Sequence, residues 1–186
     1  MKIVVCLVML IFPTIGLSFA DDRSVPAEQS AALLNGTFPR LSASNLEGQT
    51  LRLPADFAGD RNLLLIAFQR EQQQNVDTWL REMKRFEISP GFQYYELPTI
   101  DKLNPLYRWF INRGMRRGIP DRNARSRTIT LYLDKPSFRK ALGLLDERRI
   151  YAVLVDRAGR IIWRAEGDCD EVKASSLQRA LARGDQ

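Results

Sequence analysis

The stretch from Asn62 to Phe86, NLLLIAFQREQQQNVDTWLREMKRF, decides the fold. It begins with a continuous apolar run, residues 63–68, which has the length and character of a strand buried on both faces of a sheet. Four apolar side chains then recur at the spacing i, i+3, i+4 and i+7 of one helix face: Val76, Trp79, Leu80 and Met83. A polar turn from Gln69 to Asn75 joins the two. The pattern therefore predicts a central strand, a short loop and a helix.

The chain has 186 residues, enough for one domain with a hydrophobic core of its own. A lysine and an apolar run precede Ser18-Phe19-Ala20, so residues 1–20 are predicted to be a signal peptide cleaved after Ala20. Residues 21–37 are expected to form a flexible linker and residues 38–186 the folded domain. The protein is then periplasmic or secreted. The alternative is an N-terminal membrane anchor, because the same apolar run nearly spans a bilayer.

Histidine is absent, and the chain has two cysteines, Cys6 and Cys169. The lack of histidine excludes Ser-His-Asp and Cys-His catalysis and the usual zinc sites. After signal cleavage Cys169 is the only cysteine, so no intramolecular disulfide is expected. We expect no metal and no cofactor. The net charge is +6, and nucleic acid is not an expected partner because no nucleic-acid-binding signature is present.

Turn and capping signals predict the elements on either side of the central stretch. Residues 38–54 alternate around Gly48 and predict an N-terminal hairpin. A second strand, Gln93 to Leu97, is expected to end at Pro98. The pair Asn104-Pro105 is typical of a helix N-cap and first helical residue. That helix is expected to end near Gly114 and has an apolar face made of Leu103, Leu106, Tyr107, Phe110 and Ile111.

The C-terminal third continues with a β-branched strand over residues 128–133 and a short helix over residues 135–142. Residues 150–155 and 160–165 flank a turn with aspartate and glycine, which is typical of a hairpin. Asp170 is expected to cap a final helix, whose predicted apolar side consists of Val172, Leu177, Ala180 and Leu181.

A right-handed βαβ unit that precedes a terminal hairpin and helix is the topology of the thioredoxin fold. The predicted class is therefore α/β: a thioredoxin-like three-layer sandwich with a central mixed sheet, an N-terminal β-hairpin extension and an extra basic helix-loop. Active thioredoxins place a Cys-x-x-Cys pair between the central strand and its helix, where the helix dipole stabilises a thiolate. Counted from Phe68, that pair would fall at Gln73 and Val76, and neither is cysteine.

Four stretches of the chain resemble the thioredoxin-like proteins grouped with the mitochondrial ATP synthase assembly factor. They are LEGQTLRLP (46–54), LLLIAFQREQQQNVDTW (63–79), INRGMRRGIPDRNARSRTITLYLDKPSFRKAL (111–142) and IYAVLVDRAGRIIWRAEG (150–167). The resemblance implies a thioredoxin fold and a non-redox role in assembling a membrane subunit. It does not imply redox chemistry, because the loop from Leu145 to Tyr151 also lacks the proline that active members have beside their cysteines.

The extra helix-loop is strongly basic. Seven arginines occur within twenty residues: Arg108, Arg113, Arg116, Arg117, Arg122, Arg125 and Arg127. Guanidinium groups pair in a fork with carboxylates and phosphates. An acidic protein partner or an anionic membrane surface is therefore expected, the alternative being a solvated loop. Trp109 lies among them and is a candidate interfacial anchor. The candidate partner-binding residues are Gln73, Arg113, Arg116, Arg117 and Arg122.

These observations favour a non-catalytic, thioredoxin-like exported protein that binds or helps assemble a membrane-associated protein complex, and no enzyme activity is expected. Gln73 lies in the polar loop, which either contributes to a peptide groove or is a solvated connection. The alternative function is a thiol-dependent redox protein, related to peroxiredoxins and thioredoxins, that acts through Cys169 and a partner cysteine. Acidic neighbours, Asp168, Asp170 and Glu171, disfavour the thiolate that this alternative needs.

Overall fold

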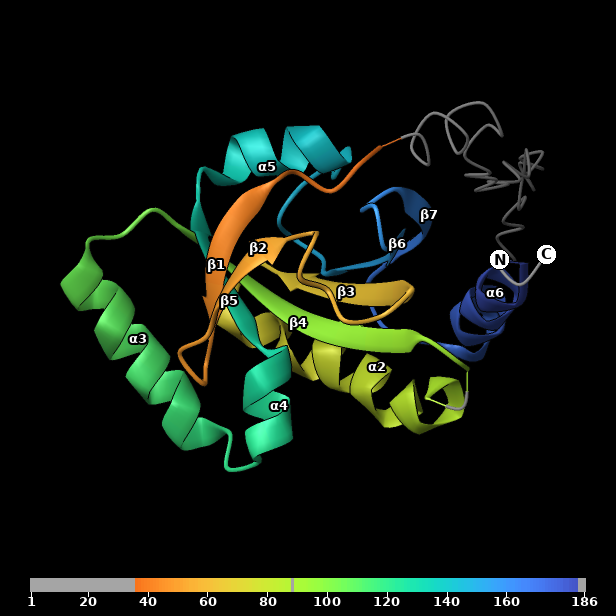
Figure 1. The fold of residues 1–186 in the computed structure, drawn as a ribbon, viewed down its shortest axis with the longest axis horizontal. Coiled ribbons are helices and arrows are strands. Elements are labelled where there is room, and N and C mark those ends of the chain that lie inside the picture. Colours follow the sequence, from red (N-terminus) through yellow and green to blue (C-terminus); the bar gives the residue numbers. More distant parts are fainter. Residues whose placement is uncertain (1–35, 88, 184–186) are drawn as a thin grey trace, which may run out of the picture.

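The computed structural model describes residues 36–87 and 89–183, which form a seven-stranded sheet in the order β2-β1-β5-β4-β3-β6-β7 (Figure 1). The strands are β1 Leu41–Asn45, β2 Thr50–Leu53, β3 Arg61–Ala67, β4 Phe92–Asp101, β5 Ile129–Leu133, β6 Tyr151–Asp156 and β7 Ile161–Glu166. The helices are η1 Arg70–Gln72, α2 Gln73–Phe86, α3 Pro105–Gly118, α4 Arg122–Arg127, α5 Lys135–Leu142 and α6 Glu171–Ala182. The expected signal peptide and residues 21–35 of the expected linker lie outside the described residues.

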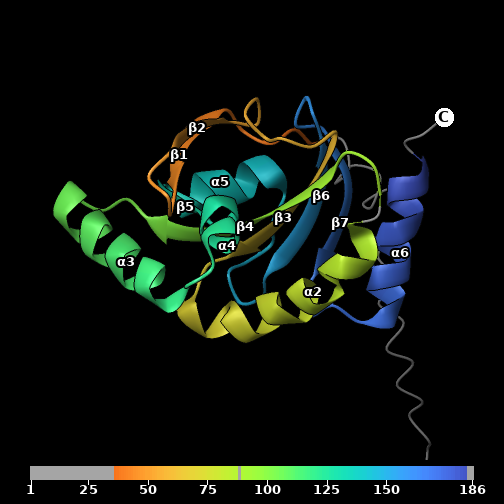
Figure 2. The same cartoon turned by 60° about the horizontal axis from the view of Figure 1, so that its bottom comes forward.

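The sheet is the middle of three layers. α2 and α6 cover one face and α5 covers the other (Figures 1 and 2). Because side chains alternate along a strand, Leu63 and Leu65 of β3 pack with α2 and α6, while Leu64 and Ile66 pack on the side of α5 with Phe138. The prediction of a central strand buried on both faces is therefore confirmed.

Strand pairing also confirms the predicted mixed sheet. β3 runs parallel to β4 and antiparallel to β6, and the two predicted hairpins form β1–β2 and β6–β7. Gly48 has φ 85° in the first hairpin turn, a conformation that costs glycine little. The helix predicted over residues 135–142 is present with the expected ends, because Asp134 accepts a hydrogen bond from the backbone of Ser137 and Gly143 takes the left-handed conformation.

Pro98 does not end the second strand, as the sequence predicts; β4 continues to Asp101. Pro98 is the last residue of β4 that pairs with β3, opposite Ala67, and Thr99 pairs with Leu131 of β5. The missing N–H thus falls at the end of one ladder, where it removes little pairing.

The basic helix-loop is more helical than predicted. α3 continues past Gly114 to Gly118, since Gly114 keeps helical geometry and the Ile119 backbone N–H donates to Met115 O at 3.1 Å. The segment after it forms α4, because the Asp121 side chain accepts hydrogen bonds from the first backbone N–H groups of that helix.

The predicted apolar face of α3 is left exposed, and so is one member of the predicted apolar side of α6. α3 has no buried residue, and Leu106, Tyr107 and Phe110 are more than half exposed. In α6 Val172 is 77% exposed, whereas Ala174, Leu177 and Leu181 are buried. The reason in α6 is helical phase, since Val172 is two residues from Ala174 and so lies on the opposite side of the helix. Within the described ranges, none of the helices is both long and apolar enough to cross a membrane.

Candidate functional site

A groove of about 960 Å³ lies between the first turns of α2 and the pair α3–α4. Residues from the end of β3, from the following loop and from β4 complete its lining, and its surface is mostly apolar. The α3 side of the groove consists of Ile111, Gly114, Met115 and Gly118, which recur at helical spacing on one face of that helix. Gly114 and Gly118 leave that wall low, because an added Cβ at either position would have no heavy atom from outside its own helix within 4 Å.

The loop between β3 and α2 is held by Gln72 rather than by cysteines. Gln72 is buried, and its side-chain oxygen accepts hydrogen bonds from the backbone N–H groups of Phe68 at 2.8 Å and Gln69 at 3.2 Å. Its Nε2 donates to the carbonyl oxygen of Glu147 at 2.7 Å. One amide therefore joins this loop to the loop that precedes β6.

Gln73 and Val76, which occupy the predicted cysteine positions, have different environments. Val76 is buried in the core beneath α2, whereas Gln73 is exposed and lines the groove. The Gln73 Nε2 donates to Asp77 Oδ1 at 3.0 Å. The structure thus places the expected candidate Gln73 at the groove, beside a carboxylate and without a thiol.

A buried carboxyl, Glu96 of β4, also lines the groove and is 9% exposed. Burial raises the pKa of Glu96, the neighbouring Asp77 carboxylate adds to the increase, and a hydrogen bond from Gln73 opposes it. The groove therefore combines an apolar wall with three clustered polar side chains, an arrangement typical of a site that binds and orients a ligand.

The arginines of the basic helix-loop differ in what they contact. Arg116 donates from Nε to Leu46 O at 2.6 Å, and Arg122 pairs with Glu47 at 3.1 Å, so both hold the N-terminal hairpin. Arg113 lies over the ring of Trp109, with its guanidinium carbon 5.0 Å from the ring centroid. For Arg113 and Arg117, none of the described residues supplies an acidic partner.

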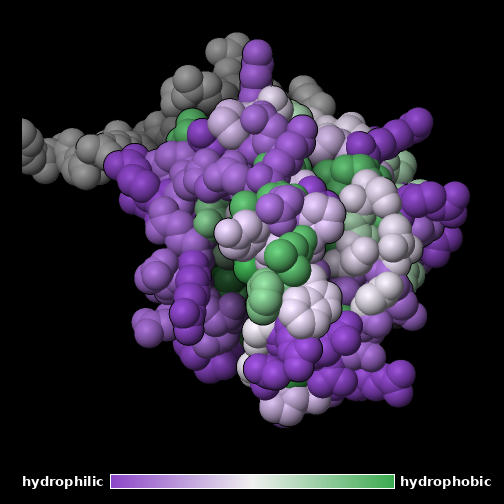
Figure 3. Space-filling model, turned by 90° about the vertical axis from the view of Figure 1, so that its left-hand side faces the viewer, coloured by the Kyte–Doolittle hydropathy of each residue, from purple (hydrophilic) through white to green (hydrophobic). Residues whose placement is uncertain are grey.

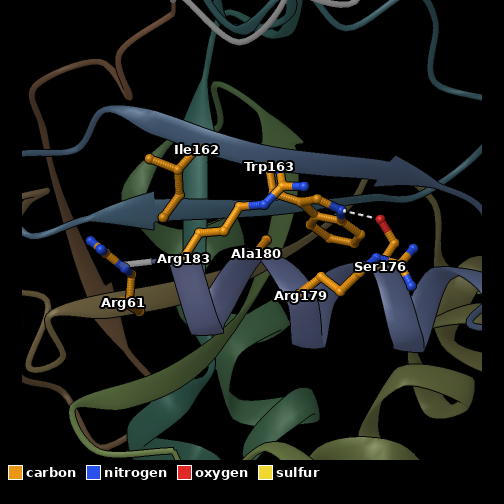
Figure 4. Close-up of a pocket in the computed structure, with 7 residues that line it drawn as sticks. All are labelled: Arg61, Ile162, Trp163, Ser176, Arg179, Ala180 and Arg183. Carbon is orange, nitrogen blue, oxygen red and sulfur yellow. Dashed lines mark hydrogen bonds between the residues drawn. The ribbon is translucent and has the colours of Figure 1, made fainter. Parts of the chain in front are cut away.

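A second hollow of about 430 Å³ lies between β7 and α6 (Figure 4). Three arginines line it, Arg61, Arg179 and Arg183, and the indole N–H of Trp163 donates to Ser176 Oγ at 3.0 Å beside them. It is smaller and lies away from the loop between β3 and α2, so the larger groove is the candidate site.

No protein-family model and no curated protein matches the sequence. Solved structures do match. A protein from Aquifex aeolicus VF5 with a proposed role in electron transport superposes with a TM-score of 0.59 at 12% identity, covering 81% of this chain and 98% of its own. The thioredoxin domain of a thiol-disulfide oxidoreductase from Bacteroides vulgatus superposes with a TM-score of 0.52 at 15% identity, covering 79% of this chain and 96% of its own. A thiol-disulfide oxidoreductase from Bacteroides fragilis superposes with a TM-score of 0.51 at 16% identity, covering 77% of this chain and 98% of its own.

The chain has a thioredoxin-like fold. At these identities the likeness establishes the fold and not the activity. The structural neighbours include redox proteins, but this thioredoxin-like chain has no Cys-x-x-Cys pair. In the described part of the chain, no group of three or more His, Cys, Asp or Glu side chains could hold a metal ion.

Cys169, which precedes α6, is the cysteine on which a redox function of this thioredoxin-like protein would depend. It is half-buried against the core layer beneath α2 and α6. Burial, followed by the carboxylates of Glu82 and Asp170, raises the pKa of Cys169 to about 11. From the sequence, a disfavoured thiolate is expected because of acidic neighbours. In the structure, burial contributes more than these neighbours to the raised pKa of Cys169.

Alkylation of Cys169 by iodoacetamide at pH 8 is expected to be about 100-fold slower than alkylation of an ordinary exposed cysteine, because the thiolate is the nucleophile. The rate of modification would be followed by mass spectrometry in a Cys6→Ser background. Unfolding in urea supplies the control, since it should restore an ordinary rate. A native rate equal to the unfolded rate would show that folding does not raise the pKa of this thiol.

Glu47, in the turn between β1 and β2, forms ion pairs with Arg125 and Arg122 and so ties the hairpin to α4. The sequence does not reveal this contact, because 75 and 78 residues separate the partners. The hydrogen bond from Arg125 is the largest of the contacts that hold the pKa of Glu47 below its usual value, and a hydrogen bond from Arg122 acts in the same direction. Some arginines of the predicted basic surface therefore form ion pairs within the protein.

Glu47→Gln is expected to reduce the loss of stability that wild type shows on acidification. A lowered folded-state pKa means that the stabilisation is complete above the unfolded pKa of about 4.3 and disappears as pH falls below it. Urea unfolding at pH 7 and pH 3 would measure this difference for each variant. Glu71→Gln, at an exposed residue of η1, is the control and should keep the wild-type difference.

Sequence reasoning missed most of the groove. Glu96 is within a strand, so its place at the groove depends on where α2 and α3 lie. A signal was present in Gly114 and Gly118, which are four residues apart and therefore share a face of any helix that contains both. The assumption that the helix ends at Gly114 hid that signal.

Proposed function

We propose that this protein is a non-catalytic thioredoxin-like protein that binds an apolar segment of a partner protein in the groove and helps to assemble the complex to which that partner belongs. The observation that supports the proposal is the location of the groove. It opens beside the loop at which thioredoxins have their cysteine pair, and its lining is mostly apolar. The resemblance to the ATP synthase assembly factor family supports an assembly role rather than redox catalysis.

The groove has the features of a peptide site. It is far larger than a water molecule, and apolar surface supplies most of its lining. Its polar side chains include a cluster in which Gln73 and Asp77 lie beside the buried Glu96. Such a site gains affinity from apolar burial and fixes the register of a bound segment through its polar cluster.

The alternative function, thiol redox chemistry through Cys169, is less well supported. A thiol whose pKa is raised to about 11 is almost entirely protonated at neutral pH and is a poor nucleophile. Cys169 also does not line the groove, so a segment bound there would not be presented to the sulfur.

In-cell photo-crosslinking tests the proposal. A benzoylphenylalanine placed at Gly118, on the rim of the groove, is expected to capture a discrete partner, because the position opens into free space. The same probe at Ala141, exposed on α5 across the sheet, is the control and should not capture it. The adduct should persist in Cys169→Ser. An adduct that needs Cys169 and is released by reductant would support the redox alternative instead, and equal capture from both sites would refute a groove-specific partner.

A further inference from the structure

α3 is the longer of the two described helices that have neither an acidic side chain nor a buried residue, the other being the six-residue α4. The 14-residue α3 protrudes at one end of the molecule, away from the layers that cover the sheet (Figures 1 and 2). Six large hydrophobic side chains are exposed among the described residues, and four of them belong to α3: Leu106, Tyr107, Trp109 and Phe110. Their exposed fractions are 63%, 60%, 51% and 58%. This helix therefore shows apolar surface that folding leaves uncovered.

The outward side of α3 is distinct from the side that lines the groove. Trp109 and Phe110 are three and four residues after Leu106, Arg113 is four and three residues after them, and Arg117 is four residues after Arg113. These five side chains therefore form one stripe along the helix. Ile111 and Met115, which line the groove, fall outside this stripe. Seen from this end, apolar side chains gather at the centre and are bordered by hydrophilic ones (Figure 3).

The stripe is apolar in its first half and basic in its second. Trp109 and Phe110 contact each other edge to face, with ring centroids 5.0 Å apart, and Arg113 lies over the Trp109 ring. A helix with tryptophan, phenylalanine and leucine beside arginines, and with no acid, is typical of helices that lie in a membrane interface. Arg113 and Arg117, for which no described residue is an acidic partner, complement the phosphate groups of anionic lipids.

We propose that the outward side of α3 docks on an anionic phospholipid surface, with Leu106, Trp109 and Phe110 inserted among the acyl chains and Arg113 and Arg117 on the phosphates. A lipid surface fits better than a protein, because five side chains on a protruding helix are far fewer than the roughly twenty to thirty residues that each side of a stable protein interface contributes. The proposal does not depend on partner binding in the groove.

Trp109 reports the insertion directly. Trp79 is fully buried and Trp163 is partly buried, so Trp109 is the exposed tryptophan of the described chain. The intact protein, as isolated from its producing cells, would be titrated with phosphatidylglycerol vesicles and with phosphatidylcholine vesicles. We expect a blue shift of tryptophan emission, and quenching by brominated acyl chains, with phosphatidylglycerol but not with phosphatidylcholine. Trp109→Phe should remove the shift while vesicle sedimentation persists.

Matched pairs of variants separate α3 from any contribution of the N-terminal segment. Arg113→Gln with Arg117→Gln is expected to weaken partitioning into phosphatidylglycerol vesicles about 25-fold, or about fivefold per arginine. The control removes the same charge from α6, at the opposite end of the molecule, through Arg179→Gln with Arg183→Gln (Figure 1). That control should change partitioning by less than about twofold, because α6 lies at the opposite end of the molecule from α3 and salt screens distant exposed charges.

The apolar half has its own control. Leu106→Ser with Phe110→Ser is expected to weaken partitioning at least about tenfold, while Leu145→Ser with Val172→Ser, at the other two exposed apolar side chains, should leave it unchanged. An unshifted Trp109 emission, or partitioning that none of the α3 variants alters, would overturn the proposal. So would α3 variants that lose a crosslinked protein partner and keep vesicle binding. A wild-type protein that binds vesicles, but from which the Gly118 probe in the groove captures no partner, would contradict only the proposed function.

Discussion

Gly114→Leu is expected to abolish photo-crosslinking of a partner from Gly118 and, at the same time, to raise the free energy of unfolding by about 1 kcal/mol. The two effects have separate causes. A leucine at this position projects from α3 into the groove, where open space surrounds the Cβ, and so occupies volume that a bound segment needs. The stability gain arises because glycine within a helix loses more backbone entropy on folding than leucine does.

This combination makes the result easy to interpret. Most substitutions that abolish binding also destabilise the protein, and lost capture is then ambiguous. A variant that unfolds at higher urea concentration but captures nothing has lost the site and kept the fold. Ala141→Leu, an exposed change on α5, is the matched control and should retain capture. Undiminished capture by Gly114→Leu would mean that the partner binds elsewhere.

Gln72→Ala is expected to lower the free energy of unfolding by about 3 kcal/mol. The substitution leaves the backbone N–H groups of Phe68 and Gln69 without their acceptor and the Glu147 carbonyl without its donor, in a buried position. Each unpaired buried polar group costs about 1–3 kcal/mol. Water that enters the small cavity can pair with some of the three groups and so lowers the total cost. Urea unfolding monitored by circular dichroism would measure the loss.

The neighbouring Gln74→Ala is the matched control for this prediction. Gln74 is exposed, and none of the described residues accepts or donates a hydrogen bond to its side chain. Its substitution should change the free energy of unfolding by less than about 0.5 kcal/mol. If the two variants lost equal stability, the contacts of Gln72 would not be what holds the loop between β3 and α2.

These contacts also indicate how a thioredoxin-like fold exists without its redox centre. The family resemblance implies that the β3–α2 loop and the loop before β6 lie together in active relatives, one with the cysteines and the other with a proline. Here the Gln72 amide joins the two loops directly, at Glu147. The apolar groove lies beside the first of these loops.

The sequence alone determined the layers of the fold. The run from Leu63 to Phe68 is apolar on both strand faces, so it had to be central, and the spacing of Val76, Trp79 and Met83 fixed the buried side of α2. Asp134 and Gly143 marked the ends of α5 correctly because capping depends on local backbone geometry. Such signals act within a few residues of each other and can be read without the tertiary structure.

The tertiary structure decided the groove and the role of each arginine. Arg113 and Arg117 belong to the same run as Arg116 and Arg122, yet only the latter two meet the β1–β2 hairpin, at Leu46 and Glu47. Likewise α3 has an apolar pattern, but its position beyond the sheet leaves that pattern exposed. Periodicity reports that a helix has an apolar side. Which surface that side meets depends on contacts between residues that are distant in the chain, and these form only when the chain has folded.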